Sequence, residues 1–316
     1  MEYVTLNNGV KMPMVGLGTF QIPLEKMNEV IGWAYSLGYR MFDTAWKYKN
    51  EGAIATALKH NGIRREDVFI STKCNADALF FGGCHAGRKG LFDVRNFKSV
   101  RKAILTSFEN LRTDYVDLFL VHWPWPIPIA QEFYIELVRM QKEGRIRAVG
   151  VCSSLPPHLD AFKDASEVVP AVNQFEISPL NTQKQLIKYC QDKGIIVEAM
   201  STFSHFRNTE TRKDIIGNER IAPIAERYGK SIPQIILRWL VQQGIVVIPK
   251  SSNKNRLQEN ISIFDFYLTE DEMSVINNLD QGKFLNYKPD VTLTKPCWIR
   301  GRVPQKYRGW QGFNEQ

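Results

Sequence analysis

Residues 116–122 read VDLFLVH, an apolar run that ends on a histidine. Apart from Asp117, the residues before the histidine are apolar, which is typical of a parallel strand buried on both faces, because a strand with one wet face would alternate. Segments of the same kind recur along the chain, each followed by a loop and then by an amphipathic stretch. The eight segments span 14–20, 39–43, 68–73, 116–122, 146–151, 170–175, 194–200 and 245–250.

Four of the amphipathic stretches predict helices with one apolar face. They span Met27–Leu37, Val100–Leu111, Glu132–Glu143 and Pro233–Gln243, the last with its proline in the first turn, where proline is tolerated. Eight strand and helix units in about 250 residues are the pattern of a (β/α)8 TIM barrel, an α/β fold.

A hairpin and a tail complete the predicted fold. Asn8-Gly9 lies between two short alternating runs, which indicates a β-hairpin that we expect to cap one end of the barrel. Thr269 and Glu272 form a capping box that begins a late helix. The long, aromatic-rich segment 282–316 is expected to pack across the active-site face. No linker divides residues 1–316, so we expect a single domain.

Composition narrows the classes of function. The net charge of +8 comes from 41 basic and 33 acidic side chains that are spread along the whole chain, so nucleic acid binding is not expected. We find neither an apolar signal core nor a membrane-spanning run, which predicts a cytoplasmic protein that does not bind membranes. Five irregularly spaced cysteines predict reduced thiols, with no disulfide framework and no metal pair.

Four ionisable residues stand where a barrel places its catalytic groups. Asp43 ends the second predicted strand, Lys73 the third and His122 the fourth, and Tyr48 lies in the loop after the second. Taken singly, an aspartate before Thr-Ala is often a helix cap, and a lone histidine is usually a core residue. At the ends of consecutive strands, the four are expected to meet at the mouth of the barrel.

These groups can act together as a proton donor. A tyrosine with a pKa near 10 is a poor acid at about pH 7, and a buried ammonium beside it is expected to lower that pKa. The ammonium keeps its proton in a dry pocket only if a carboxylate pairs with it. The sequence therefore predicts Tyr48 as general acid, Lys73 as its pKa modifier, Asp43 as counter-ion and His122 as the residue that orients a substrate oxygen.

The chain resembles the aldo-keto reductase family from about residue 3 to 280. GYRMFDTAWKYKNE (38–51) is similar to the family segment that holds the aspartate and the tyrosine. ISTK (70–73) places the lysine, LRTDYVDLFLVHWP (111–124) the histidine, and IPKSSNKNRLQEN (248–260) resembles the cofactor motif. The resemblance implies reversible reduction of aldehydes or ketones by NADPH, without a metal, by a protein that is a monomer or a weak dimer.

The segment 250–260 also predicts an anion site from its residues alone. Ser251, Ser252 and Asn253 can cap the following helix, whose N-terminus would attract a phosphate together with Lys250 and Arg256. A 2′-phosphate suits this charge, which favours NADPH over NADH; an ordinary capped helix is the alternative. By resemblance, the cofactor is expected to contact Gly18, Thr19, Phe20, Asp43, Ser153, Gln174, Lys250, Ser251, Ser252, Arg256, Glu259 and Asn260.

Two residues depart from the family pattern. Ser154 stands where an asparagine bonds the nicotinamide carboxamide, and Met200 stands where an aromatic ring stacks on the nicotinamide. A hydroxyl is shorter than an amide, and a thioether defines a pocket less sharply than a ring. We therefore expect a looser nicotinamide pocket, which NADPH affinity in Ser154→Asn and Met200→Tyr variants would test.

Aromatic residues dominate the expected substrate site, and such walls suit hydrophobic or sugar aldehydes. Lys47 is a cation where the family commonly has an apolar residue; it either favours acidic carbonyl substrates or faces solvent. Residues 75–96 form a long loop that could fold over the site. The expected substrate-binding residues are Phe20, Trp46, Lys47, Trp123, Cys297 and Trp298.

Two other functions are alternatives to a carbonyl reductase. A metal-dependent barrel hydrolase would need clustered histidines, and the five histidines form no His-x-His pair. An NADPH-binding regulatory barrel with little turnover would tolerate Ser154 and Met200, but it has no need of the four ionisable residues.

Overall fold

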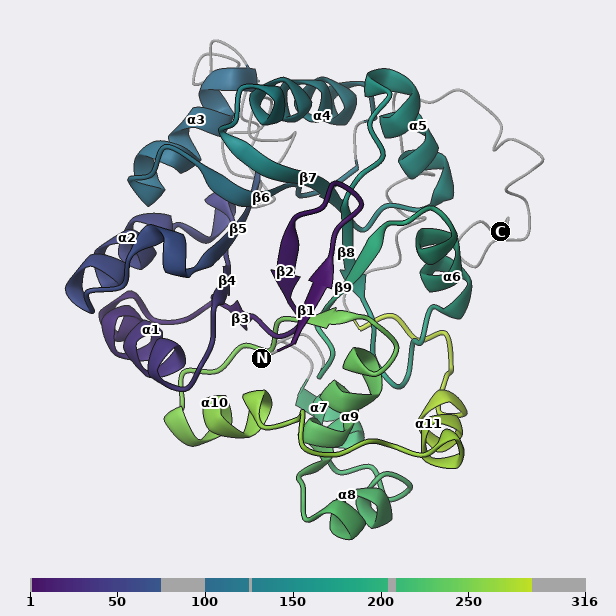
Figure 1. Cartoon of the computed structure of the whole chain (residues 1–316). Helices are drawn as coiled ribbons and strands as arrows, with labels where there is room; N and C mark the ends of the chain where they lie inside the picture. Colours follow the sequence, from purple (N-terminus) through teal and green to yellow (C-terminus); the bar gives the residue numbers. More distant parts are fainter. Residues whose placement is uncertain (1, 75–99, 125–126, 204–208, 286–316) are drawn as a thin grey trace, which may run out of the picture.

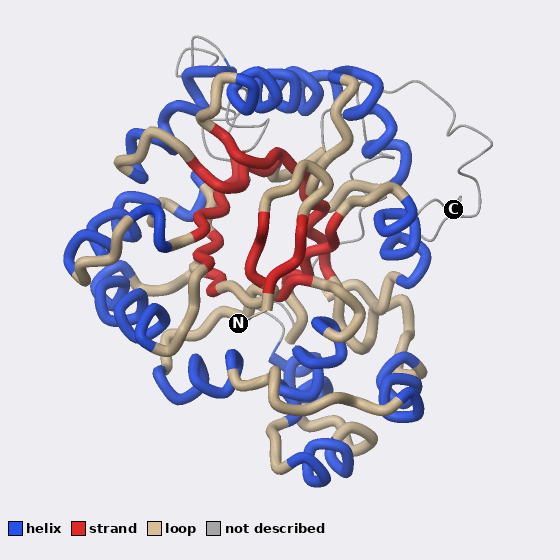
Figure 2. The backbone as a smooth tube through the Cα atoms, in the orientation of Figure 1, coloured by secondary structure: helices blue, strands red, loops and turns tan. Residues whose placement is uncertain are grey.

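The computed structural model describes residues 2–74, 100–124, 127–203 and 209–285. Within these ranges, eight parallel strands curl into a ring, and helices surround the ring on the outside (Figures 1 and 2). The order of the strands follows the sequence from β3 to β10. Their bounds are β3 Leu17–Gly18, β4 Met41–Asp43, β5 Phe69–Cys74, β6 Val116–Val121, β7 Ile146–Cys152, β8 Val172–Glu176, β9 Ile196–Met200 and β10 Val246–Val247.

The ring closes where its first strand meets its last. Val15 bridges Val247 in parallel, and the amide of Gly16 donates to the carbonyl of Val247 at 2.8 Å. Every residue of β5 and β6 is buried, as expected for strands covered by helices outside and by side chains within. The predicted (β/α)8 TIM barrel is confirmed.

The predicted hairpin is confirmed at one end of the barrel. β1 (Tyr3–Thr5) pairs antiparallel with β2 (Lys11–Pro13), and Gly9 takes the left-handed φ of 85° that the turn requires. The side chains of Asn7 and Asn8 donate to the carbonyls of Pro170 and Arg147, which lie at the N-terminal ends of β8 and β7. The hairpin therefore covers the end of the barrel that lies opposite the carboxyl ends of the strands (Figure 1).

Helices follow the strands and bury their apolar faces on the ring. The capping box of the last one is confirmed, since Thr269 accepts from the amide of Glu272 and Glu272 accepts from the amide of Thr269. The described helices are α1 Met27–Ser36, α2 Glu51–His60, α3 Val100–Leu111, α4 Ile127–Lys142, α5 Pro156–Ser166, α6 Lys184–Asp192, α7 Thr209–Ile216, α8 Ala222–Tyr228, α9 Ile232–Val241, α10 Lys254–Ile261 and α11 Glu270–Asn277.

Several expectations fall on residues that the structure does not describe. They concern the loop at 75–96 and most of the tail at 282–316, with Cys297 and Trp298 in it. No helix within the described ranges is both long enough and apolar enough to cross a membrane.

Candidate active site

A buried ion pair lies at the carboxyl ends of β4 and β5. The Nζ of Lys73 donates to both carboxylate oxygens of Asp43, at 2.5 and 2.6 Å, and to the carbonyl of Thr44 at 2.8 Å. Lys73 is fully buried and Asp43 is 2% exposed. Burial alone would lower the pKa of Lys73, but Asp43 and other nearby groups outweigh burial and raise it. The amine is therefore charged at neutral pH.

Tyr48 lies beside this pair, on the short 3-10 helix Trp46–Tyr48 that follows β4. Its ring centroid is 5.4 Å from the Nζ of Lys73 and 5.9 Å from the centroid of His122, which it meets edge-on at 78°. The ring of Phe20 also packs against it, with the ring centroids 4.8 Å apart. The structure thus brings together Asp43, Tyr48, Lys73 and His122, the four residues that the sequence analysis expects to meet at the mouth of the barrel.

The prediction that the pKa of Tyr48 lies below its ordinary value is wrong in the part of the chain that the structure describes. Burial raises the pKa of Tyr48 to about 12, and Lys73 only partly offsets this because Asp43, Cys152 and Glu198 raise the pKa further. Sequence reasoning counted the ammonium and left out the cost of burying a phenolate. Tyr48 is consequently a protonated phenol at every pH near neutrality, which is the form that a proton donor needs.

His122 is held as a neutral imidazole. It follows β6 directly, its amide donates to the carbonyl of Cys74 at 3.0 Å, and its ring stacks on that of Trp123. Burial, and after it the charges of Lys73 and Lys47, hold the pKa of His122 well below its usual value. Its Nδ1 has no hydrogen-bond partner among the described residues. A neutral ring of this kind can orient a substrate oxygen by hydrogen bonding.

A hydrogen-bond scaffold supports the loop that carries Tyr48, and sequence reasoning did not assign it. Asn50 accepts from the hydroxyl of Thr44 at 2.6 Å and donates to the carbonyl of Thr19 at 2.9 Å. Glu51 accepts from the hydroxyl of Thr72, whose neighbour in β5 is Lys73. These bonds tie the ends of β3, β4 and β5 together and so fix the relative positions of Tyr48, Asp43 and Lys73.

The residues expected to hold the cofactor phosphate line one cavity of about 240 Å³. Lys250, Ser251, Ser252, Arg256, Glu259 and Asn260 all contribute to its wall. Asn253 is the N-cap of α10 and accepts from the amide of Arg256 at 3.1 Å, as the sequence predicted for this helix start. The wall also holds Arg212 of α7, a cation that sequence reasoning did not single out. The positive side chains, the capped start of α10 and the volume of this cavity together fit a phosphorylated nucleotide.

Gly18 lies between this cavity and the ion pair, where two backbone segments approach closely. A Cβ on Gly18 would lie 2.6 Å from the carbonyl oxygen of Ile248 and 3.7 Å from the Cβ of Lys250, so only glycine fits there. Gly18 is paired with Asp43 in the sheet, and Thr19 donates to the carbonyl of Asp43 from both its amide and its hydroxyl. The expected cofactor residues therefore continue from Lys250 over Gly18 to Asp43.

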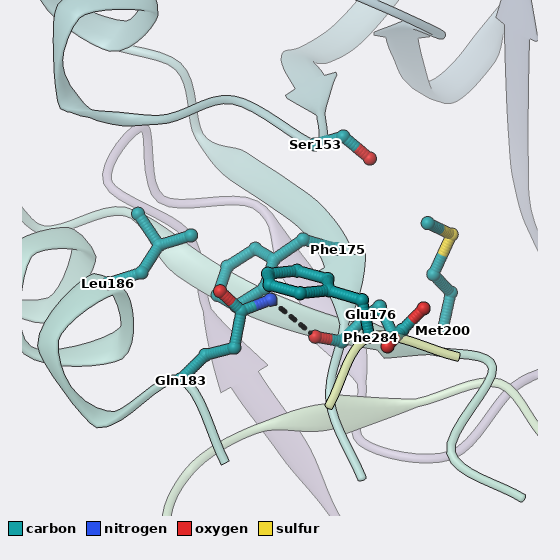
Figure 3. Close-up of a pocket in the computed structure, with 7 residues that line it drawn as sticks. All are labelled: Ser153, Phe175, Glu176, Gln183, Leu186, Met200 and Phe284. Atoms are coloured by element: carbon teal, nitrogen blue, oxygen red, sulfur yellow. Dashed lines mark hydrogen bonds between the residues drawn. The ribbon is translucent and has the colours of Figure 1, made fainter. Parts of the chain in front are cut away.

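Two other expected cofactor residues, Ser153 and Gln174, lie directly after β7 and within β8. Ser153 takes a left-handed φ of 47°, which residues other than glycine rarely adopt, and Gln174 is buried. The hydroxyl of Ser154 donates to the carbonyl of Cys152 at 3.1 Å, so that its proton is used within the chain. Ser153 and Met200 border a cavity of about 10 Å³, with room for a single water (Figure 3). The looser nicotinamide pocket stays a prediction.

The expected substrate residues that the structure describes surround Tyr48 and His122. Phe20 is 40% exposed beside Tyr48, and Trp123 stacks on His122. Trp46 is half-buried under Lys49, whose Nζ is 3.8 Å from its ring centroid. Lys47 is exposed, yet its charge reaches His122 strongly enough to lower the pKa of the imidazole. Among the described residues, no group of three or more His, Cys, Asp or Glu side chains could hold a metal ion.

Comparisons with known proteins agree with this geometry. The model of the aldo/keto reductase family matches residues 14–281. Methylglyoxal reductase DkgA of Escherichia coli O157:H7 is 37% identical over 291 residues, which cover 91% of this chain and 96% of that protein. Glyoxal reductase of Bacillus subtilis is 36% identical over 294 residues, which cover 92% of this chain and 98% of that protein.

Solved structures give the same result. A Bombyx mori aldo-keto reductase, crystallised with NADP, superposes with a TM-score of 0.77 at 30% identity, over 90% of this chain and 94% of that one. A variant of the enzyme Gox0644, crystallised with NADPH, gives a TM-score of 0.77 at 32% identity, over 92% of this chain and 97% of that one. The family match spans most of the barrel, and both sequence and structure lead to one assignment: the chain belongs to the aldo/keto reductase family.

Proposed function

We propose that this protein reduces small aldehydes and ketones to alcohols with NADPH, and that Tyr48 is the general acid. The observation that carries the proposal is the cluster of Tyr48, the charged Lys73–Asp43 pair and the neutral His122 at one end of the barrel. Relatives named for the reduction of methylglyoxal and glyoxal support a small carbonyl compound as substrate.

Each of the four residues would have a distinct role in the reduction. When bound, NADPH would supply a hydride for the carbonyl carbon of the substrate, whose oxygen then needs a proton. Tyr48 gives its phenolic proton to that oxygen, which completes the alcohol. Lys73 favours the phenolate that Tyr48 leaves behind, and Asp43 keeps Lys73 charged. His122 holds the substrate oxygen in reach of Tyr48 through a hydrogen bond from its neutral ring.

The phosphate end of the cofactor would be held by Lys250, Arg256 and the capped start of α10. Arg212 adds a third cation to the same wall and, after burial, contributes to the lowered pKa of Lys250. A charge concentration of this kind favours the additional phosphate of NADPH over the bare ribose of NADH.

The direct test is the steady-state oxidation of NADPH with a panel of carbonyl compounds that includes methylglyoxal, glyoxal and an aromatic aldehyde. We expect turnover that depends on the carbonyl compound and is weaker with NADH. Tight NADPH binding without turnover on any of them would favour the regulatory alternative instead. The names of the two relatives described above do not support that alternative, since both are called reductases.

Arg256→Leu should raise the Kd for NADPH about ten- to a hundredfold and leave the Kd for NADH within about twofold. A charge-assisted hydrogen bond to a phosphate contributes roughly 1.5–3 kcal/mol, and about 1.4 kcal/mol corresponds to a tenfold change in Kd. Both Kd values can be measured by fluorescence titration.

Lys254→Leu is the matched control, because it removes a charge from the same helix at a residue that is not among those lining the cavity. We expect it to change either Kd by less than about threefold, as for a screened surface charge. Equal weakening of NADPH and NADH in Arg256→Leu would contradict a role for Arg256 at the 2′-phosphate.

A further inference from the structure

A second buried carboxyl lies inside the barrel, and the reaction as proposed above gives it no role. Glu198 is on β9, in register with Gln174 of β8, and its side chain is fully buried. Its Oε2 accepts from the Nε2 of Gln174 at 2.8 Å. Its Oε1 has no hydrogen-bond partner among the described residues. A carboxyl group in such a place needs a physical explanation, because burying an unpaired charge is costly.

Gln174 connects Glu198 to the ion pair. The same Nε2 that bonds Glu198 also donates to the Oδ1 of Asp43 at 3.2 Å, so both of its N–H groups are used. An amide oxygen turned toward the Asp43 carboxylate would be repelled by it, and this fixes the orientation of Gln174. Its own oxygen lies 3.8 Å from the sulfur of Cys152. A continuous chain therefore runs from Lys73 through Asp43 and Gln174 to Glu198.

The charges of these four hydrogen-bonded side chains balance only if Glu198 is neutral. Lys73 and Asp43 cancel each other, so an ionised Glu198 would leave one negative charge without a cation of its own. Burial, and after it the Asp43 charge, raise the pKa of Glu198 to about 8, against the opposing effects of Lys73 and the Gln174 hydrogen bond. The other titratable groups near it are Tyr48 and Cys152, which are both uncharged near neutral pH.

We propose that Glu198, in its uncharged form, is a positioning residue of the reductase site: it holds Gln174 against Asp43, and its ionisation makes Tyr48 a weaker proton donor. This inference rests on the proposed function. The charge of Glu198 acts on Tyr48 through space, since an anion nearby disfavours the phenolate that forms when Tyr48 gives up its proton. Loss of the Glu198 proton should accordingly slow the reduction while leaving the fold intact.

The first test uses the protein without cofactor or substrate. Unfolded, Glu198 releases its proton near the ordinary value of 4.5; folded, it keeps the proton up to about pH 8. The unfolded state thus binds fewer protons over this range, and the stabilising contribution is lost as the pH rises. Glu198→Gln cannot ionise. We expect its Tm to rise relative to the wild type as the pH increases from 5 to about 8, whereas a constant difference would overturn the assignment of a neutral Glu198.

The second test measures kcat against pH at saturating NADPH. In the wild type, kcat should fall above about pH 8, and Glu198→Gln should remove this decline while keeping kcat at pH 7 within about threefold. Glu198→Leu leaves Gln174 without its partner on β9 and should lower kcat about tenfold at every pH. A decline that persists unchanged in Glu198→Gln would overturn the proposal.

Glu51→Gln is the matched control. Glu51 is also buried with a raised pKa, but it accepts hydrogen bonds from Thr72 and Asn110 rather than from Gln174. Its replacement should leave the decline of kcat above pH 8 unchanged, and loss of that decline in Glu51→Gln would also count against Glu198. Absence of any turnover in the wild type would refute the proposed function alone, because the Tm experiment still reports whether Glu198 is neutral.

Discussion

Replacing Tyr48 by phenylalanine should lower kcat for carbonyl reduction by about a thousandfold, within the range found for general acids. The change removes only the phenolic oxygen and keeps the ring that packs on Phe20 with a centroid distance of 4.8 Å. NADPH binding should stay within about twofold, because the phosphate cavity around Lys250 and Arg256 is untouched. Steady-state kcat with a small aldehyde and a fluorescence titration with NADPH measure the two effects separately.

Tyr39→Phe provides the comparison for this result. Tyr39 is a buried tyrosine, and its hydroxyl donates to the carbonyl of Leu257 at 2.9 Å, outside the cluster around Tyr48. Its replacement should cost about 1 kcal/mol of stability through the lost hydrogen bond and leave kcat nearly unchanged. If Tyr48→Phe kept more than about a tenth of the wild-type kcat, another group would have to supply the proton.

The acid form of Tyr48 should not limit the reduction at ordinary pH. Since burial raises the pKa of Tyr48 to about 12, the phenol carries its proton throughout the range in which the protein would be assayed. The rate then depends on how readily the proton leaves, which is governed by Lys73, Asp43 and Glu198 around it. This is why the charge state of Glu198, rather than that of Tyr48, is expected to set the alkaline decline.

The fold could be predicted because its signals are local. Each of the eight strands lies in a short segment that contains apolar or β-branched residues, and the parallel arrangement follows from the helices between them. Strand lengths were less predictable: segment 14–20 forms only the short β3, and segment 245–250 only the short β10. Both lie where the ring closes through the Val15–Val247 bridge, and Pro249 has no amide proton to extend the ladder.

The site was predictable for residues that stand at the ends of strands and less so for residues inside the barrel. Asp43 and His122 could be identified because each directly follows apolar residues, and Lys73 because it is the charged residue that ends the segment VFISTK (68–73). Glu198 interrupts such a run in IIVEAM (195–200), and a charged residue inside an apolar strand is the sequence feature that indicates a functional carboxyl group there. The raised pKa of Tyr48 could not be read from the sequence, since it depends on burial and on which charges the fold brings near.

Lys73→Met should lower the free energy of unfolding by about 3–5 kcal/mol at neutral pH and abolish most of the activity. The substitution fills the space but leaves Asp43, which is 2% exposed, as a buried carboxylate without a cation. The hydrogen bond from Gln174 at 3.2 Å is much weaker than the two bonds from Lys73, at 2.5 and 2.6 Å, that are lost. Urea unfolding, followed by far-UV circular dichroism, measures the loss as a lower midpoint with an unchanged slope.

The double variant Asp43→Asn with Lys73→Met distinguishes two free energies. One is the net stabilisation that the whole ion pair gives, and the other is the destabilisation caused by removing only one partner. Removing both charges should recover at least about 2 kcal/mol of the loss, because a buried pair contributes little net stability once its desolvation is counted. Activity should not recover with it, since Tyr48 would then have no cation to favour its phenolate. Additive losses in the double variant would mean that Asp43 and Lys73 stabilise the barrel independently. In that case the pair could not be the feature that keeps Lys73 charged for Tyr48.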